Sequence, residues 1–283
     1  MNRPYIICLA LIVLMTPSQS LAQGTPIRAI TKVSGDLYRF QNNNHFSVFL
    51  ITSEGAIATD PIDKGAAAWL KAEIQRRFNH SVKFLVYSHD HRDHIAGGEV
   101  FDEAIVIAHV NTKHKIIGEN RPTAIPDLTF SDKMTIELGD RMVHLIYAGR
   151  NHSDNSTVMY FPSERAVFAV DFISVDRMPW RTLNDTYLPE WFESIRKVEA
   201  LDFDIILPGH GIVGTKEDVT EHREYLELLY GSVLKSVREG KSLDEIKQSV
   251  RFDQYKHFDQ YESSLLLNIE GVHRMITANR MGN

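Results

Sequence analysis

The chain has 283 residues, of which 43% are hydrophobic and 24% charged, so it can bury the core of a globular protein. It contains 31 Lys and Arg against 37 Asp and Glu, and the formal net charge of −6 argues against nucleic acid as the main partner. Its 16 Gly and 10 Pro form no low-complexity tract, which excludes fibrous and disordered classes. The unusual feature is the presence of 13 histidines, several of them clustered.

Residues 1–22 have the pattern of a secretory signal peptide. Arg3 supplies a positive start, residues 5–15 are an apolar core, and Ser20-Leu21-Ala22 offers small residues at the positions that signal peptidase inspects. An uncleaved anchor is the alternative, but about 11 apolar residues are well short of the roughly 20 that span a bilayer. We therefore predict a cleaved signal, a mature chain 23–283 without a stable membrane anchor, and a periplasmic or secreted location.

The only cysteine, Cys8, lies in the predicted signal peptide. The mature chain would then have neither a thiol nor a disulfide, which suits export to an oxidising compartment. Any metal site in it must be built from histidine and carboxylate side chains.

The mature chain begins with β-rich runs and then alternates strands with helices. Turn signals divide residues 27–60 into short runs and predict an antiparallel meander. A helix is predicted over 64–78 with Asp63 as its N-cap, and a buried strand follows at 82–87. Further strands are predicted at 104–108, 133–138, 142–147, 157–161, 166–170 and 204–207, and further helices at 190–199, 216–239, 243–250 and 262–275.

Strands precede helices in each of two halves of the chain. This order predicts the α/β class, with two mixed sheets packed face to face and helices outside them. Because no linker-like stretch divides the sequence, residues 23–283 are predicted to form a single domain that ends in helices.

The residues suited to chemistry follow predicted strands. Directly after the strand at 82–87 comes Ser88-His89-Asp90-His91-Arg92-Asp93-His94, an H-x-H-x-D-H pattern, and His152, Asp171 and His210 each follow a later apolar run. Neutral imidazole and carboxylate are the ligands expected for Zn²⁺ and similar divalent ions. A solvated histidine-rich loop is the alternative, and the later His and Asp residues at strand ends argue against it.

The set H-x-H-x-D-H, then His, then Asp, then Gly-His resembles the metallo-β-lactamase superfamily, and the resemblance runs from Asp60 to Gly211. It implies an αβ/βα four-layer sandwich of two mixed β-sheets flanked by helices, with a metal site at one edge between the sheets. It also implies two divalent metal ions, with Zn²⁺ as the expected ion.

Carried over to this sequence, the resemblance assigns His89, His91 and His152 to a first ion, Asp93, His94 and His210 to a second, and Asp171 to both. Asp60 would be a buried residue that orients the ligand loop, with a turn residue before Pro61 as the alternative. Gly97-Gly98 would let the backbone pass close to packed neighbours.

Two such ions can share a water, lower its pKa toward 7 and present it to a carbonyl or phosphorus. Asp93 could also orient that water and receive its proton, which makes it the predicted catalytic residue. The resemblance thus implies an exported metal-dependent hydrolase that cleaves a small ester, thioester, lactone or lactam. Its partner would be a small-molecule substrate, not nucleic acid, and the sequence does not indicate an oligomeric state.

Three alternatives stay open. Asp171 stands where the most common acquired β-lactamases of this family have cysteine, which weakens the interpretation as an antibiotic hydrolase. Persulfide dioxygenases of the same fold share much of the motif and bind one iron through two His and one Asp. The third alternative is a non-catalytic periplasmic accessory protein that keeps a metal for stability.

Substrate specificity is predicted to lie in variable loops around the metal site. Residues 42–46 fall where relatives have a hairpin overlooking the site, so Phe46 is a candidate contact. Residues 172–187 follow Asp171 and contain Trp180, Arg181 and Tyr187, candidates for an aromatic wall with a cation for a substrate carboxylate. Ordinary packing is the alternative for each of them. Histidines that match no motif position are predicted to be structural or surface residues: His80, His109, His114, His144, His222, His257 and His273.

Overall fold

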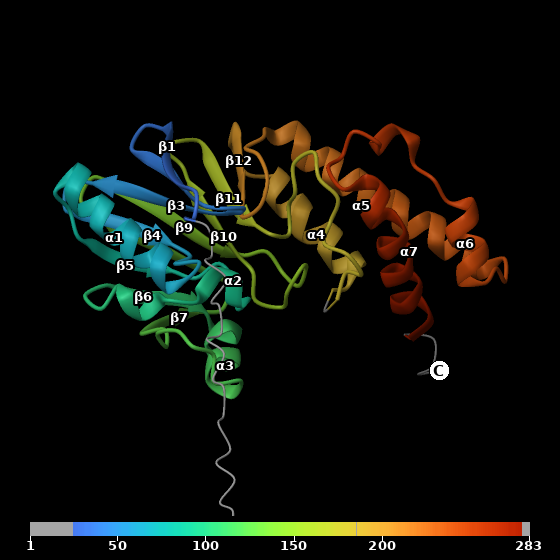
Figure 1. The fold of residues 1–283 in the computed structure, drawn as a ribbon, viewed down its shortest axis with the longest axis horizontal. Helices are drawn as coiled ribbons and strands as arrows, with labels where there is room; N and C mark the ends of the chain where they lie inside the picture. The colour runs from blue at the N-terminus through green and yellow to red at the C-terminus, as the bar shows by residue number, and fades with distance from the viewer. Residues whose placement is uncertain (1–24, 185, 279–283) are drawn as a thin grey trace, which may run out of the picture.

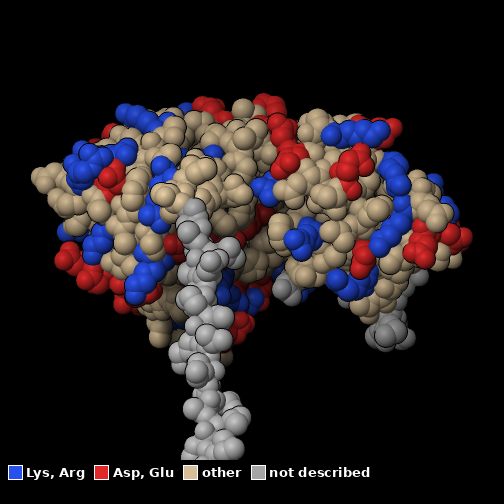
Figure 2. Space-filling model, in the orientation of Figure 1, with Lys and Arg blue, Asp and Glu red and all other residues tan. Residues whose placement is uncertain are grey.

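The computed structural model describes residues 25–184 and 186–278. Figure 1 shows two packed sheets with helices on their outer faces. The predicted signal peptide at 1–22 lies outside the described residues. Across the described ranges, no helix is both long and apolar enough to cross a bilayer. On the face shown in Figure 2, Lys and Arg are interspersed with Asp and Glu.

The first sheet has seven strands that neighbour one another in chain order. They are β1 (Arg28–Ser34), β2 (Leu37–Asn42), β3 (His45–Thr52), β4 (Gly55–Thr59), β5 (Val82–Val86), β6 (Ile105–His109) and β7 (Leu128–Phe130). β1 to β4 form the predicted antiparallel meander, and β4 to β7 pair in parallel.

The second sheet has five strands in the order β12-β11-β10-β9-β8. They are β8 (Lys133–Leu138), β9 (Arg141–Tyr147), β10 (Thr157–Phe161), β11 (Ala166–Val170) and β12 (Ile205–Pro208). Only β11 and β12 pair in parallel within this sheet, so both sheets are mixed, as predicted.

The predicted helices are present as α1 (Lys64–Phe78), α4 (Leu188–Glu199), α5 (Lys216–Arg238), α6 (Leu243–Ser249) and α7 (Tyr261–Ala278). The sequence did not predict α2 (Arg92–Ile95), α3 (Val110–Gly118) or the 3₁₀ turns Gly98–Val100 and Asp253–Tyr255. It also missed β7. Periodicity could not reveal these elements, because α2, β7 and the 3₁₀ turns have three or four residues and α3 buries only Thr112 and Ile116.

Alternating side chains of the strands build the layers. In β3, Val48 and Leu50 face the second sheet, whereas Phe49 packs in the cluster that contains Leu70 and Ile74 of α1. In β11, Phe168 packs between the sheets, while the residues on either side of it face the helices of the second sheet. This period of two gives four layers, in the order helix, sheet, sheet, helix.

Candidate metal centre

The loops after β5, β11 and β12 and the loop before β10 converge at one edge of the sandwich. They bring the seven predicted ligand residues into two groups, and the ligand atoms within each group lie within 4.8 Å of one another. The first group is His89, His91, His152 and Asp171, and the second is Asp93, His94, Asp171 and His210. Asp171 belongs to both groups, as the resemblance implied.

The spacing of these atoms suits a divalent ion. His152 Nε2 lies 3.1 Å from His91 Nδ1, and His94 Nε2 lies 3.2 Å from Asp171 Oδ2. His210 Nε2 lies 3.5 Å from Asp93 Oδ2. Tetrahedral zinc ligands at about 2.1 Å from the ion are about 3.4 Å from one another, which agrees with these separations.

Three atoms in the centre are buried and have no hydrogen-bond partner: His89 Nε2, His94 Nε2 and Asp171 Oδ1. Buried polar atoms in native proteins are nearly always paired. Nitrogen and carboxylate oxygen are the donor types that bind zinc and similar ions, so the residues fit such an ion.

Asp60 orients both halves of the ligand loop. Its fully buried carboxylate accepts hydrogen bonds from Ser88 N at 2.8 Å and from Ser88 Oγ at 2.6 Å. It also accepts from His94 Nδ1 at 3.0 Å, and Ser88 Oγ in turn lies 2.9 Å from His89 Nδ1. These contacts turn Nε2 of His89 and of His94 toward the centre, the role that the resemblance implied for Asp60.

The strained backbone at Val170 and the missing side chain at Gly209 set the position of the Asp171 carboxylate. Val170 immediately before it has φ of 46°, which is unusual for a β-branched residue and therefore costs free energy. Gly209 packs against the centre so closely that a Cβ there would lie 2.6 Å from Asp171 Oδ1 and 2.8 Å from His94 Cε1. The glycine of the Pro208-Gly209-His210-Gly211 sequence therefore makes room for the carboxylate.

Gly97 and Gly98 have the close packing that was predicted for them. A Cβ on Gly97 would lie 2.6 Å from Lys64 N, and a Cβ on Gly98 would overlap the hydroxyl of Tyr87. The backbone after α2 thus passes directly against the start of α1 and the end of β5.

The burial of the centre controls its protonation. Burial lowers the pKa of His89, and it lowers that of His152 to about 4, so both imidazoles are neutral at pH 7, the form that binds metal. Burial also acts to lower the pKa of His94, but the nearby Asp171 and Asp60 carboxylates raise it well above its usual value. For Asp171, burial acts to raise the pKa, whereas His94 and His210 hold it well below its usual range.

His45 was not singled out from the sequence, yet it belongs to the site. Its Nε2 lies 3.3 Å from Asp93 Oδ2. The residues beside it hold the loop after β12, because Asn44 O accepts a hydrogen bond from His210 Nδ1 at 2.9 Å and Phe46 N donates to Gly209 O at 2.8 Å. The available signal was strand alternation, since His45 and Phe46 must face opposite sides of the sheet.

One of the four candidate substrate contacts lines the cavity beside the metal centre. This cavity has a volume of about 470 Å³. Of the four candidates, only Trp180 lines it. The lining residues are Asn44, His45, His91, Asp93, His152, Val170, Asp171, Ser174, Arg177, Met178, Trp180 and His210.

The other three candidates do not line this cavity, and their role as substrate contacts stays a prediction. Phe46 points away from His45 and stacks with Arg39, whose Cζ lies 3.6 Å from its ring centre. The guanidinium of Arg181 stacks on the Trp180 ring at 4.6 Å, and Tyr187 contacts Arg150 at 5.2 Å instead. Among the described residues that line the cavity, the cation is Arg177.

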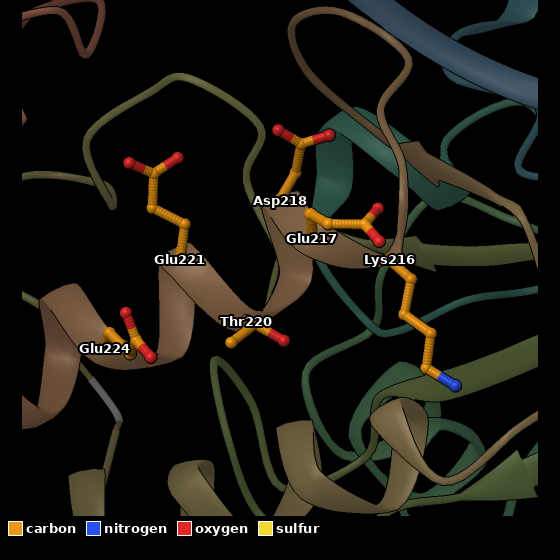
Figure 3. Close-up of a pocket in the computed structure, with 6 residues that line it drawn as sticks. All are labelled: Lys216, Glu217, Asp218, Thr220, Glu221 and Glu224. Atoms are coloured by element: carbon orange, nitrogen blue, oxygen red, sulfur yellow. The ribbon is translucent and has the colours of Figure 1, made fainter.

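A hollow of about 610 Å³ lies along the first turns of α5, where the acidic side chains project outward from the helix (Figure 3). No histidine lines it, so it lacks the donors of the centre. A nearby group, Asp176, Glu221 and His257, places His257 Nε2 3.4 Å from Glu221 and 3.7 Å from Asp176. These side chains are partly exposed and pair with one another, as is typical of a surface ion-pair network.

Residues 62–210 match the model of the Metallo-beta-lactamase superfamily. The chain belongs to this superfamily. Its helices α5 to α7 lie beyond the matched residues. The resemblance that the sequence motifs suggested is therefore confirmed, as is the predicted sandwich of two mixed sheets.

Curated relatives of the superfamily are distant. The chain is 26% identical over 212 residues to the 2,4-dinitroanisole O-demethylase subunit alpha of Nocardioides sp. (strain JS1661), an alignment that covers 73% of this chain and 64% of that protein. It thus spans less than two thirds of that relative's length. It is 25% identical over 210 residues to a metallo-beta-lactamase type 2 of Elizabethkingia meningoseptica, with 69% of this chain and 84% of that protein covered.

Solved structures share the fold. The metallo-beta-lactamase from Pontibacter korlensis superposes with a TM-score of 0.64 at 20% identity, over 71% of this chain and 99% of that one. The DIM-1 metallo-beta-lactamase gives 0.63 at 19% identity, over 71% and 98%. At these sequence identities the similarity shows that the fold is shared, and nothing more.

Proposed function

We propose that the protein is an exported metal-dependent hydrolase of a small ester, thioester, lactone or lactam. The observation that carries the proposal is the pair of ligand groups that share Asp171 at the base of an open cavity. A merely structural metal site needs neither a second group nor a cavity beside it. Export is supported by the signal-like pattern of residues 1–22.

The first group of residues would hold one divalent ion and the second group another, with Zn²⁺ as the expected ion. When bound, such a pair lowers the pKa of a water and polarises a carbonyl oxygen. Asp93 lines the cavity, and its carboxylate is ionised because His210 and His45 lower its pKa against the effect of burial. As an ionised carboxylate it can orient the attacking water by accepting a hydrogen bond from it, and it is the proposed acceptor of the proton that this water releases.

The lining of the cavity indicates the kind of substrate. Met178 and Trp180 offer an apolar wall, and Arg177 places a cation beside it. An apolar or aromatic group next to a carboxylate would satisfy all three side chains. The substrate is then expected to be an anionic small molecule with a hydrophobic substituent near the bond that is cleaved.

The test is a set of initial rates for the zinc-loaded mature chain, Gln23 onward. The substrates are a cephalosporin, an acyl-homoserine lactone, a glutathione thioester and 2,4-dinitroanisole, the last chosen because it appears in the name of a relative. The control is His152→Ala. We expect turnover of at least one of the first three substrates in the wild type and none in the control. Turnover of 2,4-dinitroanisole alone, which is an aryl ether, would contradict the proposed class of bond.

Metal content separates the alternatives. Two zinc ions per chain with turnover support the proposal. One iron per chain, with oxygen consumed on addition of a persulfide, would instead identify a dioxygenase. Full metal occupancy without any turnover would favour an accessory protein. Export is tested by finding the protein in the periplasmic or secreted fraction with Gln23 as its first residue.

A further inference from the structure

The C-terminal helix α7 packs directly on the part of the chain that lines the cavity. We define residues 174–184 as the wall segment. It contains Ser174, Arg177, Met178 and Trp180, all of which line the cavity. In Figure 1, α7 follows α6 and lies beside α5, outside the superfamily-matched residues.

A glycine of α7 fits against the wall segment without space for a side chain. A Cβ on Gly271 would lie 2.1 Å from Thr182 O and 2.6 Å from Thr182 C. Both are backbone atoms, so the contact cannot be relieved by rotating a side chain. The spacing between the helix and the wall segment therefore depends on this glycine.

Polar contacts fix the same interface. Asn268, which is fully buried, donates from Nδ2 to Pro179 O at 3.2 Å and to Arg181 O at 2.5 Å. Its Oδ1 accepts from Tyr225 of α5 at 2.8 Å. Arg274 donates to Thr182 O at 2.9 Å. The backbone on both sides of Trp180 is thus anchored to α7.

The residues just before α7 extend this attachment to the other end of the wall segment. Met178 N donates to Asp259 O at 3.1 Å, and Asp259 N donates to Asp176 O at 2.7 Å. Both bonds join backbone atoms, so they fix the course of the chain beside Arg177.

The wall segment is strained, so it needs such an anchor. Asp176, Arg181 and Leu183 have φ values of 47°, 40° and 49°, in the left-handed region that costs free energy for residues with a side chain. Strained conformations persist only where the surrounding structure imposes them, and they gather at functional sites.

We propose that α7 is the positioning element of the cavity, and that Gly271, Asn268 and Arg274 hold the wall segment so that Trp180, Met178 and Arg177 face the substrate. The helix touches none of the metal ligands through these contacts, so it sets substrate affinity and not metal binding. This role in affinity rests on the proposed hydrolase function, whereas the positioning itself does not.

The experiment compares Gly271→Ala and Arg274→Ala with two matched controls. Gly231→Ala is the first control, because a Cβ on Gly231 in α5 meets nothing within 4 Å. Arg238→Ala removes an exposed arginine from the end of α5. The side chain of Arg274 is exposed, so Arg274→Ala is expected to fold. This variant therefore still tests the proposal if Gly271→Ala does not fold.

The first measurement is limited trypsin digestion of the zinc-loaded chain, with mass analysis of fragments that begin at Met178 or Thr182. We expect these fragments to form roughly tenfold faster in both α7 variants, since a released loop opens more often. The controls should cleave at the wild-type rate, and zinc content should be unchanged throughout. Wild-type cleavage rates in both α7 variants would overturn the positioning role.

The second measurement is steady-state kinetics on a substrate that is turned over and on its analogue with a methyl in place of the apolar group. For the larger substrate we expect KM to rise about fivefold with kcat nearly unchanged. The KM of the smaller one should rise less, because it lacks the group that contacts Met178 and Trp180 but keeps the carboxylate beside Arg177. If trypsin cleaves the wall segment of the α7 variants faster but their KM for the larger substrate is unchanged, the role in substrate affinity is overturned. Absence of turnover in the wild type would reject the hydrolase proposal. The rates of trypsin cleavage would still decide whether α7 positions the wall segment.

Discussion

His45 Nε2 lies 3.3 Å from Asp93 Oδ2, so a strand that supplies none of the seven predicted ligands contacts the second ligand group. Asp93 is otherwise only half-buried, and its position depends on the histidines around it. The β2–β3 hairpin therefore acts on the centre through one side chain and, through Asn44 and Phe46, on the loop that carries His210.

His45→Phe is expected to lower kcat by about tenfold, the effect typical of losing a residue that orients a ligand, and to lower the metal bound per chain from two ions toward one, because only the second ligand group loses a contact. His45→Gln keeps a donor nitrogen and should retain most of both. Plasma mass spectrometry and initial rates measure the two quantities. His144→Gln, in β9, is the control. Equal values for His45→Phe and the wild type would show that Asp93 does not need this contact.

Asp60→Ala should destabilise the metal-free protein by about 2–4 kcal/mol, because it leaves Ser88 N and His94 Nδ1 buried without their acceptor. Urea unfolding measures the change. Asp36→Ala removes a partner of Arg141 at the surface and should cost at most about 1 kcal/mol. A similar loss of unfolding free energy in the two variants would mean that the buried Asp60 carboxylate contributes no more to stability than a surface carboxylate.

Gly209→Ala should reduce metal affinity without unfolding the protein. Its Cβ would collide with Asp171 Oδ1 and His94 Cε1, and relief by local shifts is expected to cost about 1–3 kcal/mol. Competition with a chelator measures the affinity. Gly118→Ala in α3 meets nothing within 4 Å and should behave as the wild type. Unchanged affinity in Gly209→Ala would show that the carboxylate moves aside freely.

The metal-free protein should lose stability as the pH falls. Burial lowers the pKa of His222 from 6.5 to about 4 in the folded state, so the unfolded chain binds a proton first. The stability is complete above pH 6.5 and is lost as the pH falls toward 4, by about 2 kcal/mol between pH 7 and 5 for this residue. Urea unfolding at several pH values measures the slope. His222→Leu should reduce the slope by this residue's share, because His89 and His152 also have lowered pKa values and contribute to it. An unchanged slope would contradict the assignment.

The sequence predicted the architecture because its core strands are four or more residues of continuous or alternating apolar character, and because the long helices carry apolar stripes. The seven ligand residues were assigned by the resemblance to the superfamily, and their positions after apolar runs supported that assignment. Side-chain orientation was harder to predict: the hairpin position of residues 42–46 made Phe46 a candidate contact, whereas alternation along β3 turns its neighbour His45 toward the centre.

The wall segment was the least predictable part of the site. It has no secondary structure of its own, and helix α7, about 90 residues further along the chain, holds its backbone. The position of residues 172–187 after Asp171 predicted Arg181 as the cation beside the substrate, and this stays a prediction. In the structure Arg177 lines the cavity, and the residues on either side of it along the segment, Asp176 and Arg181, are in the left-handed region, which no sequence pattern indicates.

The hydrogen bond from His210 to Asn44 joins residues 166 positions apart. A growing chain therefore cannot complete the second ligand group until residue 210 has been synthesised and docked on the first hairpin. If the protein crosses a membrane unfolded, ions would be acquired only after translocation. The ions available in the receiving compartment, and not those at the ribosome, would then determine which metal the protein carries.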